Sequence, residues 1–507
     1  MLYKESTLIM RIIIIILLTL SLNISARASF DFNTRCRNAY EQMMLFDFSE
    51  AQSILNQEKK LHPNNKVPQY IEAYIAFWKA ALNENLTDME QYDDLANTVI
   101  NAISKDQQNS PFKNYFLSDM YLRGAYLKAM EKSYMTAAYR FNKAYNLSLK
   151  NQKEYPNFIP NKKLVGLMNV GIGSVPKKYN WVLTVFNFEG DINQGLSELN
   201  QLLIISAHEP KYHYLLSESL LIYSFTMLNF EVNKEKEEEL LKIYDWDIIN
   251  NELTKNQFMI FGKASFLKHL KKNNEAIECV LSRKPNKTSM HFYYLDYMLG
   301  ECLLYRQDSL AANYLSKYVT EYHGLSYRRS ACQKWAWTYL LDGNQIEYRK
   351  KIKLLLTFGD DNRDSDQQAT KEAESGISPN VTLLKARLLF DGGYYKKANH
   401  VLKTANTQSF TKRDRMEYLY RFARIYDEWG KQDLAITNYK RSIATGQNLD
   451  YYFAANSALH LGYIYERKGD LKMAKTLYQK CLDMDFEEYH NSITQKAKAA
   501  LNRLEEK

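Results

Sequence analysis

Residues that interrupt helices are scarce in this sequence. Its 507 residues include only 9 prolines and 18 glycines, whereas tyrosine occurs 39 times. Proline and glycine are the residues least compatible with a helix interior. Few such residues, together with many aromatic ones, favour helices along the chain.

Cysteines are also few, and their number is odd. A disulfide framework needs an even and closely spaced set, often with short spacings such as CxxC. The chain has no CxxC pair, and its 5 cysteines are widely separated. We therefore expect all of them to be buried as small apolar side chains: Cys36, Cys279, Cys302, Cys332 and Cys481.

An excess of charge of one sign is missing as well. The chain has 67 Lys and Arg against 58 Asp and Glu, a net charge of +9. Without residues 1–28 the counts are 64 and 57, which leaves +7. This charge is mild and forms no basic block, which argues against nucleic acid as a partner.

Signatures of catalysis are absent from the sequence. It contains neither HExxH nor GxxxxGK[ST], and its 9 histidines are scattered. An enzyme should show a nucleophile with a base, a metal cluster or a phosphate-binding loop. We expect no catalytic residues and no cofactor, and a hydrolase activity in the purified protein would overturn this expectation.

One acidic segment has the spacing of a calcium loop. Asp360, Asn362, Asp364 and Asp366 follow the pattern of its ligands. Ser365 stands where the loop needs glycine, and Lys371 takes the place of the bidentate glutamate. We interpret the segment as a solvated connector without a metal site, in which Asp364, Ser365 or Asp366 caps a helix.

The start of the chain carries a short apolar run. Arg11 precedes apolar residues 12–22, and Ala26-Arg27-Ala28 fits a cleavage site before Ser29. A helix of that length rises about 16 Å, short of the roughly 30 Å hydrocarbon core. We interpret residues 1–28 as a secretory signal, with retention as an anchor left open. Few cysteines then favour a periplasmic or envelope-associated protein of a Gram-negative bacterium.

What the sequence does contain is a repeated unit near its end. Gly469 sits at the expected turn of a helix pair, and Gly462 and Ala474 are expected to face each other where the two helices cross. The stretch from Leu461 to Leu482 resembles the tetratricopeptide repeat, with Leu461, Gly462, Tyr465, Gly469, Ala474, Tyr478 and Leu482 at its characteristic positions.

The same pattern recurs toward the start of the chain. Copies begin 39 residues earlier, around Ala423 and Gly430, and another 37 residues before that, around Ala386 and Gly393. Stacked helix pairs bury a continuous core and wind into a superhelix with a concave wall. We predict an all-α, right-handed superhelical solenoid of about ten tetratricopeptide-like helix pairs. Its expected parts are a signal (1–28), N-terminal repeats (29–160), an atypical helical segment (161–250) and a C-terminal solenoid (251–507).

The atypical segment contains a second recognisable motif. Val175-Pro176, Phe188, Gly190-Asp191, Gly195-Leu196 and Leu199 resemble a motif of the inclusion-body-clearance and tetratricopeptide repeat outer-membrane protein family. The resemblance supports helical repeats on both sides. Its apolar residues, including Trp181, Val182 and Val185, are either core or a hairpin that touches a membrane or a partner.

Inward positions of the first helices in the three strong copies form a row. Arg387 and Arg424 hold the same position in adjacent repeats, where they would grip a peptide carboxylate while aromatic rings bury its side chains. The alternative is intramolecular pairing of Arg387 with Asp391, and of Arg424 with Asp427 or Glu428. The predicted row consists of Arg387, Phe390, Tyr420, Arg424, Asp427, Tyr463 and Arg467.

The sequence thus predicts an exported, non-catalytic scaffold that binds a protein or peptide in its concave groove. The alternative is a glycan-binding component of nutrient uptake at the outer membrane, whose aromatic residues would stack on sugar rings. Association with a membrane surface or an outer-membrane complex through residues 164–199 is left open. The sequence sets neither the partner's identity nor the oligomeric state.

Overall fold

The computed structural model describes residues 29–175, 180–230, 234–359 and 363–505. The predicted signal, residues 1–28, lies outside the described residues. Within the described part every regular element is a helix and no strand occurs. This confirms the all-α helical-repeat fold. The chain divides into two compact units, Met1–Phe266 with Ser282–Phe292 (unit 1) and Leu267–Leu281 with Tyr293–Lys507 (unit 2).

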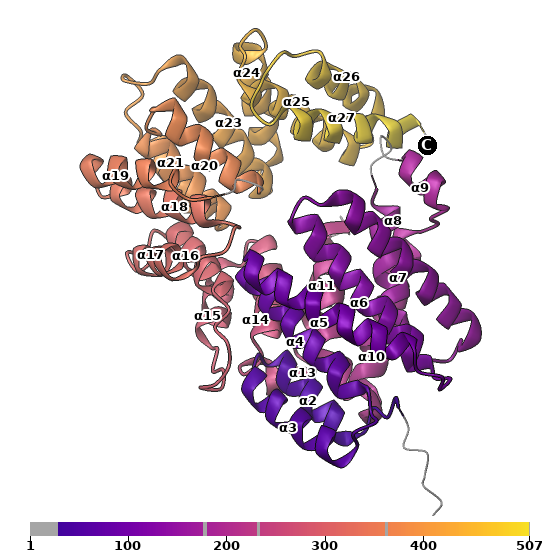
Figure 1. The fold of residues 1–507 in the computed structure, drawn as a ribbon. Coiled ribbons are helices and arrows are strands. Elements are labelled where there is room, and N and C mark those ends of the chain that lie inside the picture. Colours follow the sequence, from indigo (N-terminus) through magenta and orange to yellow (C-terminus); the bar gives the residue numbers. More distant parts are fainter. Residues whose placement is uncertain (1–28, 176–179, 231–233, 360–362, 506–507) are drawn as a thin grey trace, which may run out of the picture. The chain divides into compact units, whose positions relative to one another are not determined.

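Unit 1 is a succession of helix pairs (Figure 1). Consecutive helices pack as α2 with α3, α4 with α5, and α6 with α7, and α8 packs with α10 across the short α9. Polar residues that cap helix starts include Asn33, Asp47, Asn85, Ser110 and Asp191. The helices are α2 (Thr34–Met44), α3 (Phe48–Leu61), α4 (Val67–Asn83), α5 (Leu86–Ser104), α6 (Pro111–Met130), α7 (Tyr134–Glu154), α8 (Asn161–Gly173), α9 (Asn180–Phe186), α10 (Ile192–His208), η2 (Pro210–Leu215), α11 (Leu216–Phe230), α12 (Lys234–Ile243), α13 (Asp247–Leu253) and α14 (Gln257–His269). The last three residues of α14, from Leu267 on, belong to unit 2.

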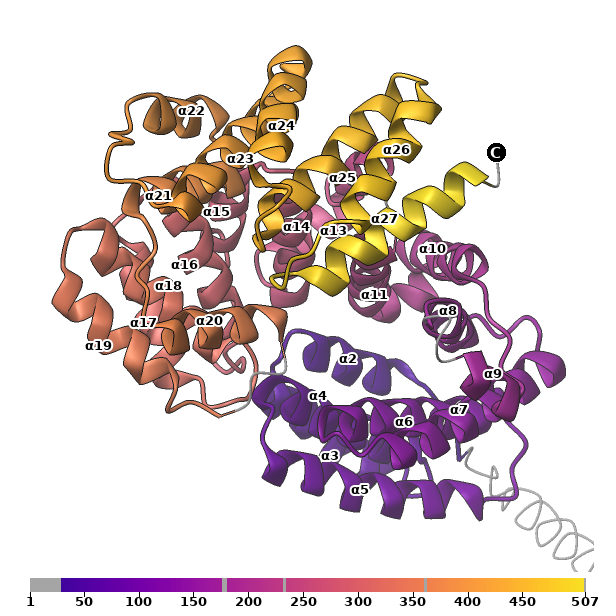
Figure 2. The same ribbon diagram turned by 90° about the horizontal axis from the view of Figure 1, so that it is seen from above.

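Unit 1 closes on itself, because its later helices return to its first ones. Helix α11 contacts both α2 and α8 (Figure 2). The ring of Tyr214 stacks on Phe32, with 4.8 Å between centroids. The loop 282–292 packs against the start of the same unit: the Met290 amide donates to the Phe46 carbonyl at 2.9 Å, and the Thr288 hydroxyl donates to Asp47 at 2.7 Å.

Unit 2 contains the three strong repeats. They are the pairs α21/α22, α23/α24 and α25/α26, each packed on the next, with α27 against the last. The helices are α15 (Asn273–Leu281), α16 (Tyr294–Arg306), α17 (Ala311–Glu321), α18 (Arg328–Leu341), α19 (Gln345–Leu355), α20 (Asp364–Ser375), α21 (Val381–Asp391), α22 (Tyr395–Lys403), α23 (Lys412–Glu428), α24 (Gln432–Gly446), α25 (Tyr452–Arg467), α26 (Leu471–Leu482) and α27 (His490–Glu505).

The residues of the repeat pattern occupy the expected kinds of place. Gly393, Gly430 and Gly469 have φ of +80°, +75° and +81°, the left-handed conformation that the turns require. The second-helix alanines of all three repeats are fully buried. One detail differs: the atoms nearest to a Cβ on Gly462 belong to the ring of Tyr478 rather than to Ala474. The glycine therefore makes room for the aromatic ring.

The prediction of a solvated connector for the acidic segment was wrong over residues 364–375, which form a helix with a buried face. Residues 364–375 form α20, in which Asp366 is fully buried. Its carboxylate accepts hydrogen bonds from the backbone amides of Tyr327 (2.7 Å) and Ser330 (2.8 Å) at the start of α18. Asp366 thus caps another helix, not its own. The positions 360 and 362 of the calcium pattern lie outside the described residues, and the described residues contain no group of three or more side chains suited to a metal.

The atypical segment packs two helices at close range. Helices α8 and α10 cross at Gly166 and Gly195, and Leu199 is fully buried against Gly166. Asp191 caps α10 by accepting from the Gln194 amide at 2.7 Å. Phe188 and Leu199 of the motif are buried, whereas in the apolar cluster before them Val175 and Phe186 are partly buried and Val185 is exposed. The choice between core and docking hairpin for that cluster stays open. Residue 176 and the side chains at 181 and 182 lie outside what the structure describes.

The cysteine prediction is confirmed, since all five are buried with free thiols. Burial raises the pKa of the thiols of Cys302, Cys332 and Cys481 to about 12. Among the described helices, none combines the length and the apolar character needed to cross a membrane. The boundaries at residues 160 and 250 stay predictions.

Gly195→Ala is expected to destabilise unit 1. Its Cβ would lie 2.7 Å from the Gly166 carbonyl oxygen and 2.8 Å from the Val170 nitrogen, so α8 and α10 would have to separate. We expect the free energy of unfolding to fall by about 1–3 kcal/mol. The matched control is Gly171→Ala on α8, where a Cβ meets nothing within 4 Å; it should be neutral or stabilise by up to ~1 kcal/mol. Urea unfolding of both variants measures this, and equal stabilities would contradict the close crossing.

Candidate functional site

The predicted row lies on the first helices α21, α23 and α25 of unit 2. Arg387 on α21 has a side chain that is 39% exposed, with its Nε 3.7 Å from the Asp391 carboxylate. Its guanidinium lies 5.5 Å from the centre of the Trp337 ring. Phe390 is buried in the core of the unit. The Arg387 side chain is thus accessible to solvent, whereas Phe390 packs in the core and anchors α21.

Arg424 on α23 is held from several sides. Its side chain is 17% exposed and lies 3.5 Å from Glu428. Its Nη1 donates to His460 Nε2 on α25 at 2.5 Å and to the Tyr420 hydroxyl at 3.4 Å. Burial, and then the charge of Arg424, lower the pKa of His460 well below its usual range. His460 is therefore neutral and accepts the hydrogen bond, which links neighbouring repeats.

Asp427 and Arg467 form a second link between the same repeats. Arg467 Nη2 on α25 lies 3.2 Å from Asp427 on α23. The Tyr439 hydroxyl on α24 donates to the same carboxylate at 3.0 Å. Arg467 is exposed, whereas Asp427 is largely covered. Tyr463 is partly buried beside the rings of His460 and Tyr478.

The structure therefore brings most of the predicted row together. Phe390, Tyr420 and Arg424 form one contact group, because Arg424 also lies 5.3 Å from the centre of the Phe390 ring. Asp427 and Arg467 form another, and Arg387 stands apart from both. The pairs Arg387 with Asp391 and Arg424 with Glu428 are the one-turn ion pairs that the sequence offered as the alternative. Arg387 and Arg467 are the charged members that remain accessible.

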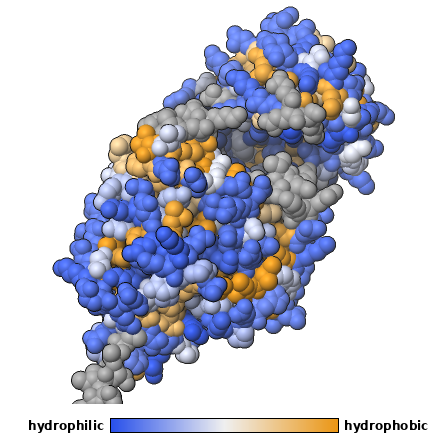
Figure 3. Space-filling view, turned by 90° about the vertical axis from the view of Figure 1, so that its right-hand side faces the viewer, coloured by the Kyte–Doolittle hydropathy of each residue, from blue (hydrophilic) through white to orange (hydrophobic). Residues whose placement is uncertain are grey.

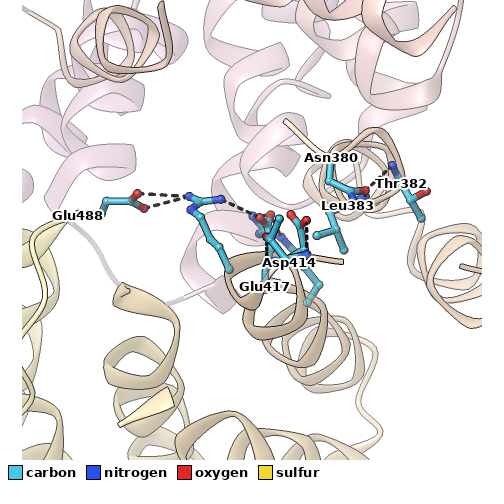
Figure 4. A network of polar contacts seen from close by, with 9 residues as sticks. Asn380, Thr382, Leu383, Asp414, Glu417 and Glu488 are labelled. Carbon is cyan, nitrogen blue, oxygen red and sulfur yellow. Dashed lines mark hydrogen bonds and ion pairs between the residues drawn. The ribbon is translucent and has the colours of Figure 1, made fainter. Parts of the chain in front are cut away.

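Sequence reasoning missed a polar network beside this row (Figure 4). Arg413 lies 3.4 Å from Glu417 on its own helix and 3.3 Å from Glu488, which precedes α27. Arg421 donates to Glu417 at 2.9 Å. The spacing of four between Arg413, Glu417 and Arg421 signals pairing along one helix. No pattern near Glu488 in the sequence predicts its ion pair with Arg413, because the two residues are 75 positions apart.

A larger omission lies in unit 1, where four charged side chains are buried together: Asp119, Arg123, Lys163 and Glu218. They come from α6, α8 and α11. Lys163 Nζ lies 3.1 Å from both Asp119 and Glu218. Arg123 Nη2 pairs with Asp119 and lies 3.7 Å from Glu218. Two carboxylates and two cations thus balance in the interior.

Tyrosines complete this cluster. The hydroxyls of Tyr40 and Tyr74 donate to Glu218, and that of Tyr70 donates to Asp119 at 2.5 Å. Burial alone would raise the pKa of Asp119, but the charges of Arg123 and Lys163 outweigh it and lower the pKa. Asp119 is therefore ionised. The sequence does contain a sign of this buried cluster, because charged residues interrupt apolar stretches, as Glu218 does in "LLSESLLI".

Unit 2 has a smaller cluster of the same kind. Glu301 on α16 is buried, pairs with Lys268, and lies 3.5 Å from Lys334 on α18. Burial opposes its ionisation, but the two lysines outweigh burial and lower the pKa of Glu301 to about 2. Both units thus contain buried ion pairs between the first helices of neighbouring helix pairs.

Comparisons with known proteins agree with the repeat fold. A family model described as "Tetratricopeptide repeat" matches residues 417–444 and 455–488, which are α23/α24 and α25/α26. No curated protein sequence matches the chain.

Solved structures that resemble the chain have low identity and low TM-scores. Yeast Tom70 is 11% identical, with a TM-score of 0.31 over 87% of this chain and 90% of its own. A monomeric mutant of IFIT1 with m7Gppp-AAAA is 14% identical, with a TM-score of 0.29 over 81% and 99%. The APC/C hetero-tetramer Cut9-Hcn1 gives 12% and 0.23 over 94% and 99%. The fold assignment therefore rests on the helix pairs themselves.

The neutral His460 predicts a specific loss of stability in acid. The unfolded chain takes up a proton near the ordinary value of 6.5, whereas folded His460 stays neutral because its pKa is lowered. Its contribution is fully present above pH 6.5 and falls below it by up to about 1.4 kcal/mol per pH unit. We expect wild type to lose roughly 1 kcal/mol more than His460→Gln between pH 6.5 and 5.5. Equal losses in urea unfolding at the two pH values would contradict the neutral acceptor.

Proposed function

We propose that this chain is a non-catalytic tetratricopeptide scaffold that binds another protein, or an extended segment of one, through the first helices of unit 2. Residues 1–28 support export, which would place the mature protein in the periplasm or at the envelope. The resemblance of residues 175–199 to the outer-membrane repeat family is part of this proposal, as is contact with a membrane complex. Concave surfaces of such repeats are their usual binding surfaces.

The observation that carries the proposal is the incomplete pairing of the arginines in the row. Arg387 and Arg424 lie 3.7 and 3.5 Å from their carboxylates, whereas strong charge-assisted hydrogen bonds are about 2.7–2.9 Å long. Arg424 Nε has no hydrogen-bond partner among the described residues. That nitrogen is buried, so the donors that remain for a partner's carboxylate are those of the accessible Arg387 and Arg467, which would bind it in the two-pronged geometry that arginine favours.

The surroundings of the row favour polar recognition. Phe390 and Tyr420 are buried beneath the arginines and fix their positions instead of contacting a partner. Figure 3 shows the face on the right-hand side of Figure 1, where apolar residues lie in patches among hydrophilic ones. The accessible charged members of the row itself are Arg387 and Arg467. We therefore expect an acidic segment in the partner, read by Arg387 and Arg467.

Crosslinking and capture from the native envelope, followed by affinity measurement with the recovered protein, test this proposal. The variant is Arg387→Ala/Arg467→Ala, which removes the two accessible arginines and leaves the inter-repeat link of Arg424 intact. We expect the variant to bind the partner about tenfold more weakly or worse. Its affinity should also fall less steeply with salt concentration than that of wild type, because ions screen each of the surface charge contacts that it has lost.

The matched control is Arg349→Ala/Arg441→Ala, which removes two exposed arginines from the second helices α19 and α24. It makes the same change in net charge away from the row and should bind as wild type does. If the two double variants lose affinity equally, general attraction by positive charge accounts for binding. If neither loses affinity, the partner binds elsewhere on the chain.

A further inference from the structure

A cavity of about 580 Å³ lies inside unit 1. Its lining comes from α4, α6, α7, α8, α9 and α11, and most of it is apolar, including Phe77, Leu122, Phe141, Leu167 and Leu221. The volume falls in the range of sites for small molecules, roughly 300–1,000 Å³. Exposed residues also belong to the lining, among them Tyr126 and Gly171, so the cavity reaches the surface.

The buried charge cluster lines one part of this cavity. Asp119, Arg123, Lys163 and Glu218 all belong to the lining, as does Tyr74. Arg123 is 6% exposed, and its guanidinium lies against the ring of Tyr74. An otherwise apolar cavity thus has a single polar end, which would orient a molecule inside it.

One donor of this polar end is left over. Arg123 Nη2 forms an ion pair with Asp119, whereas Nη1 has neither an ion-pair nor a hydrogen-bond partner among the described residues, and neighbouring atoms cover both nitrogens. A buried donor without a partner is unfavourable, and a group that accepts its hydrogen bond is favoured. Because Arg123 lines the cavity, a small rotation of its side chain would present this N–H group to an acceptor atom in a bound molecule.

The charge of the cluster selects the kind of acceptor. The carboxylates of Asp119 and Glu218 already balance Arg123 and Lys163, so a bound anion would add an uncompensated negative charge in the interior. A carbonyl or ether oxygen accepts the hydrogen bond without changing the charge. We propose that unit 1 binds a small, neutral, largely apolar molecule with one acceptor oxygen, held by the cavity wall and Arg123.

Fluorescent probes of matched size test the site in the purified full chain. Prodan is a neutral naphthalene ketone, N-phenylnaphthylamine is neutral but has no carbonyl, and anilinonaphthalene sulfonate is an anion. We expect saturable binding of Prodan with a blue-shifted emission, and binding of the sulfonate at least tenfold weaker. Absence of saturable Prodan binding, or equal binding of the sulfonate, would overturn the proposal.

Two variants at Gly171 locate the probe. A Cβ at this lining position meets nothing within 4 Å, so the backbone tolerates a side chain there. Gly171→Phe adds a bulky ring at the lining of the cavity, and Gly171→Ala is its control. We expect Gly171→Phe to weaken Prodan binding at least tenfold and Gly171→Ala to leave it within twofold. Equal binding by the two variants would show that the probe binds elsewhere.

Arg123→Lys tests the hydrogen bond. It keeps the charge that balances Asp119 and Glu218, but it replaces the guanidinium by a single ammonium nitrogen, so Nη1 is lost. We expect at least fivefold weaker binding of Prodan and unchanged binding of N-phenylnaphthylamine. Equal weakening of both probes would refute the acceptor contact. If this variant fails to fold, as thermal unfolding would show, the Gly171 pair and the sulfonate still decide the proposal.

Discussion

The pairing of charges on the inward faces of the first helices is the constraint on which both units depend. A charge removed from water is tolerated only where an opposite charge and hydrogen bonds compensate it. In unit 1 the carboxylate of Glu218 on α11 meets Lys163 on α8 and the hydroxyls of Tyr40 and Tyr74 on α2 and α4. These contacts fix how the helices of that unit close around their interior. In unit 2, Glu301 links α14 and α18 to α16 in the same way through Lys268 and Lys334.

The same constraint leads to different functional surfaces in the two units. In unit 1 the charges are sequestered, and one guanidinium nitrogen remains for a molecule in the cavity. In the row of unit 2, Arg387 and Arg467 are paired but exposed, so donors of these two side chains remain open to a partner's carboxylate. A small-molecule site and a protein-binding surface would thus both use charged side chains on first helices, which are buried in unit 1 and partly exposed in unit 2.

The sequence predicts local features well and long-range ones poorly. The glycines at 393, 430 and 469 and the buried alanines of the second helices follow from spacing within one repeat, and the structure confirms them. Asp119 and Glu218 are brought together only because unit 1 closes on itself, and no pattern within a repeat encodes that closure. The mistaken prediction of a solvated connector at residues 364–375 has the same cause, because the residues that bury Asp366 lie at the start of α18, almost 40 residues earlier in the chain. Alignment of the repeats predicted the row, and spacing along one helix offered its one-turn ion pairs as the alternative, but the burial of Phe390 and Tyr420 depends on packing.

A double-mutant cycle between Glu218→Gln and Lys163→Met measures the buried pairing directly. Urea unfolding of wild type, both single variants and the double variant gives the coupling free energy of the two side chains. Because Lys163 Nζ lies 3.1 Å from Glu218 with both groups buried, we predict a coupling of about 1–3 kcal/mol, with each single variant destabilised by the charge left unpaired. Effects that add to within about 0.5 kcal/mol would show that the two groups do not interact in the folded protein. The charge-balanced interior of unit 1 would then be wrong.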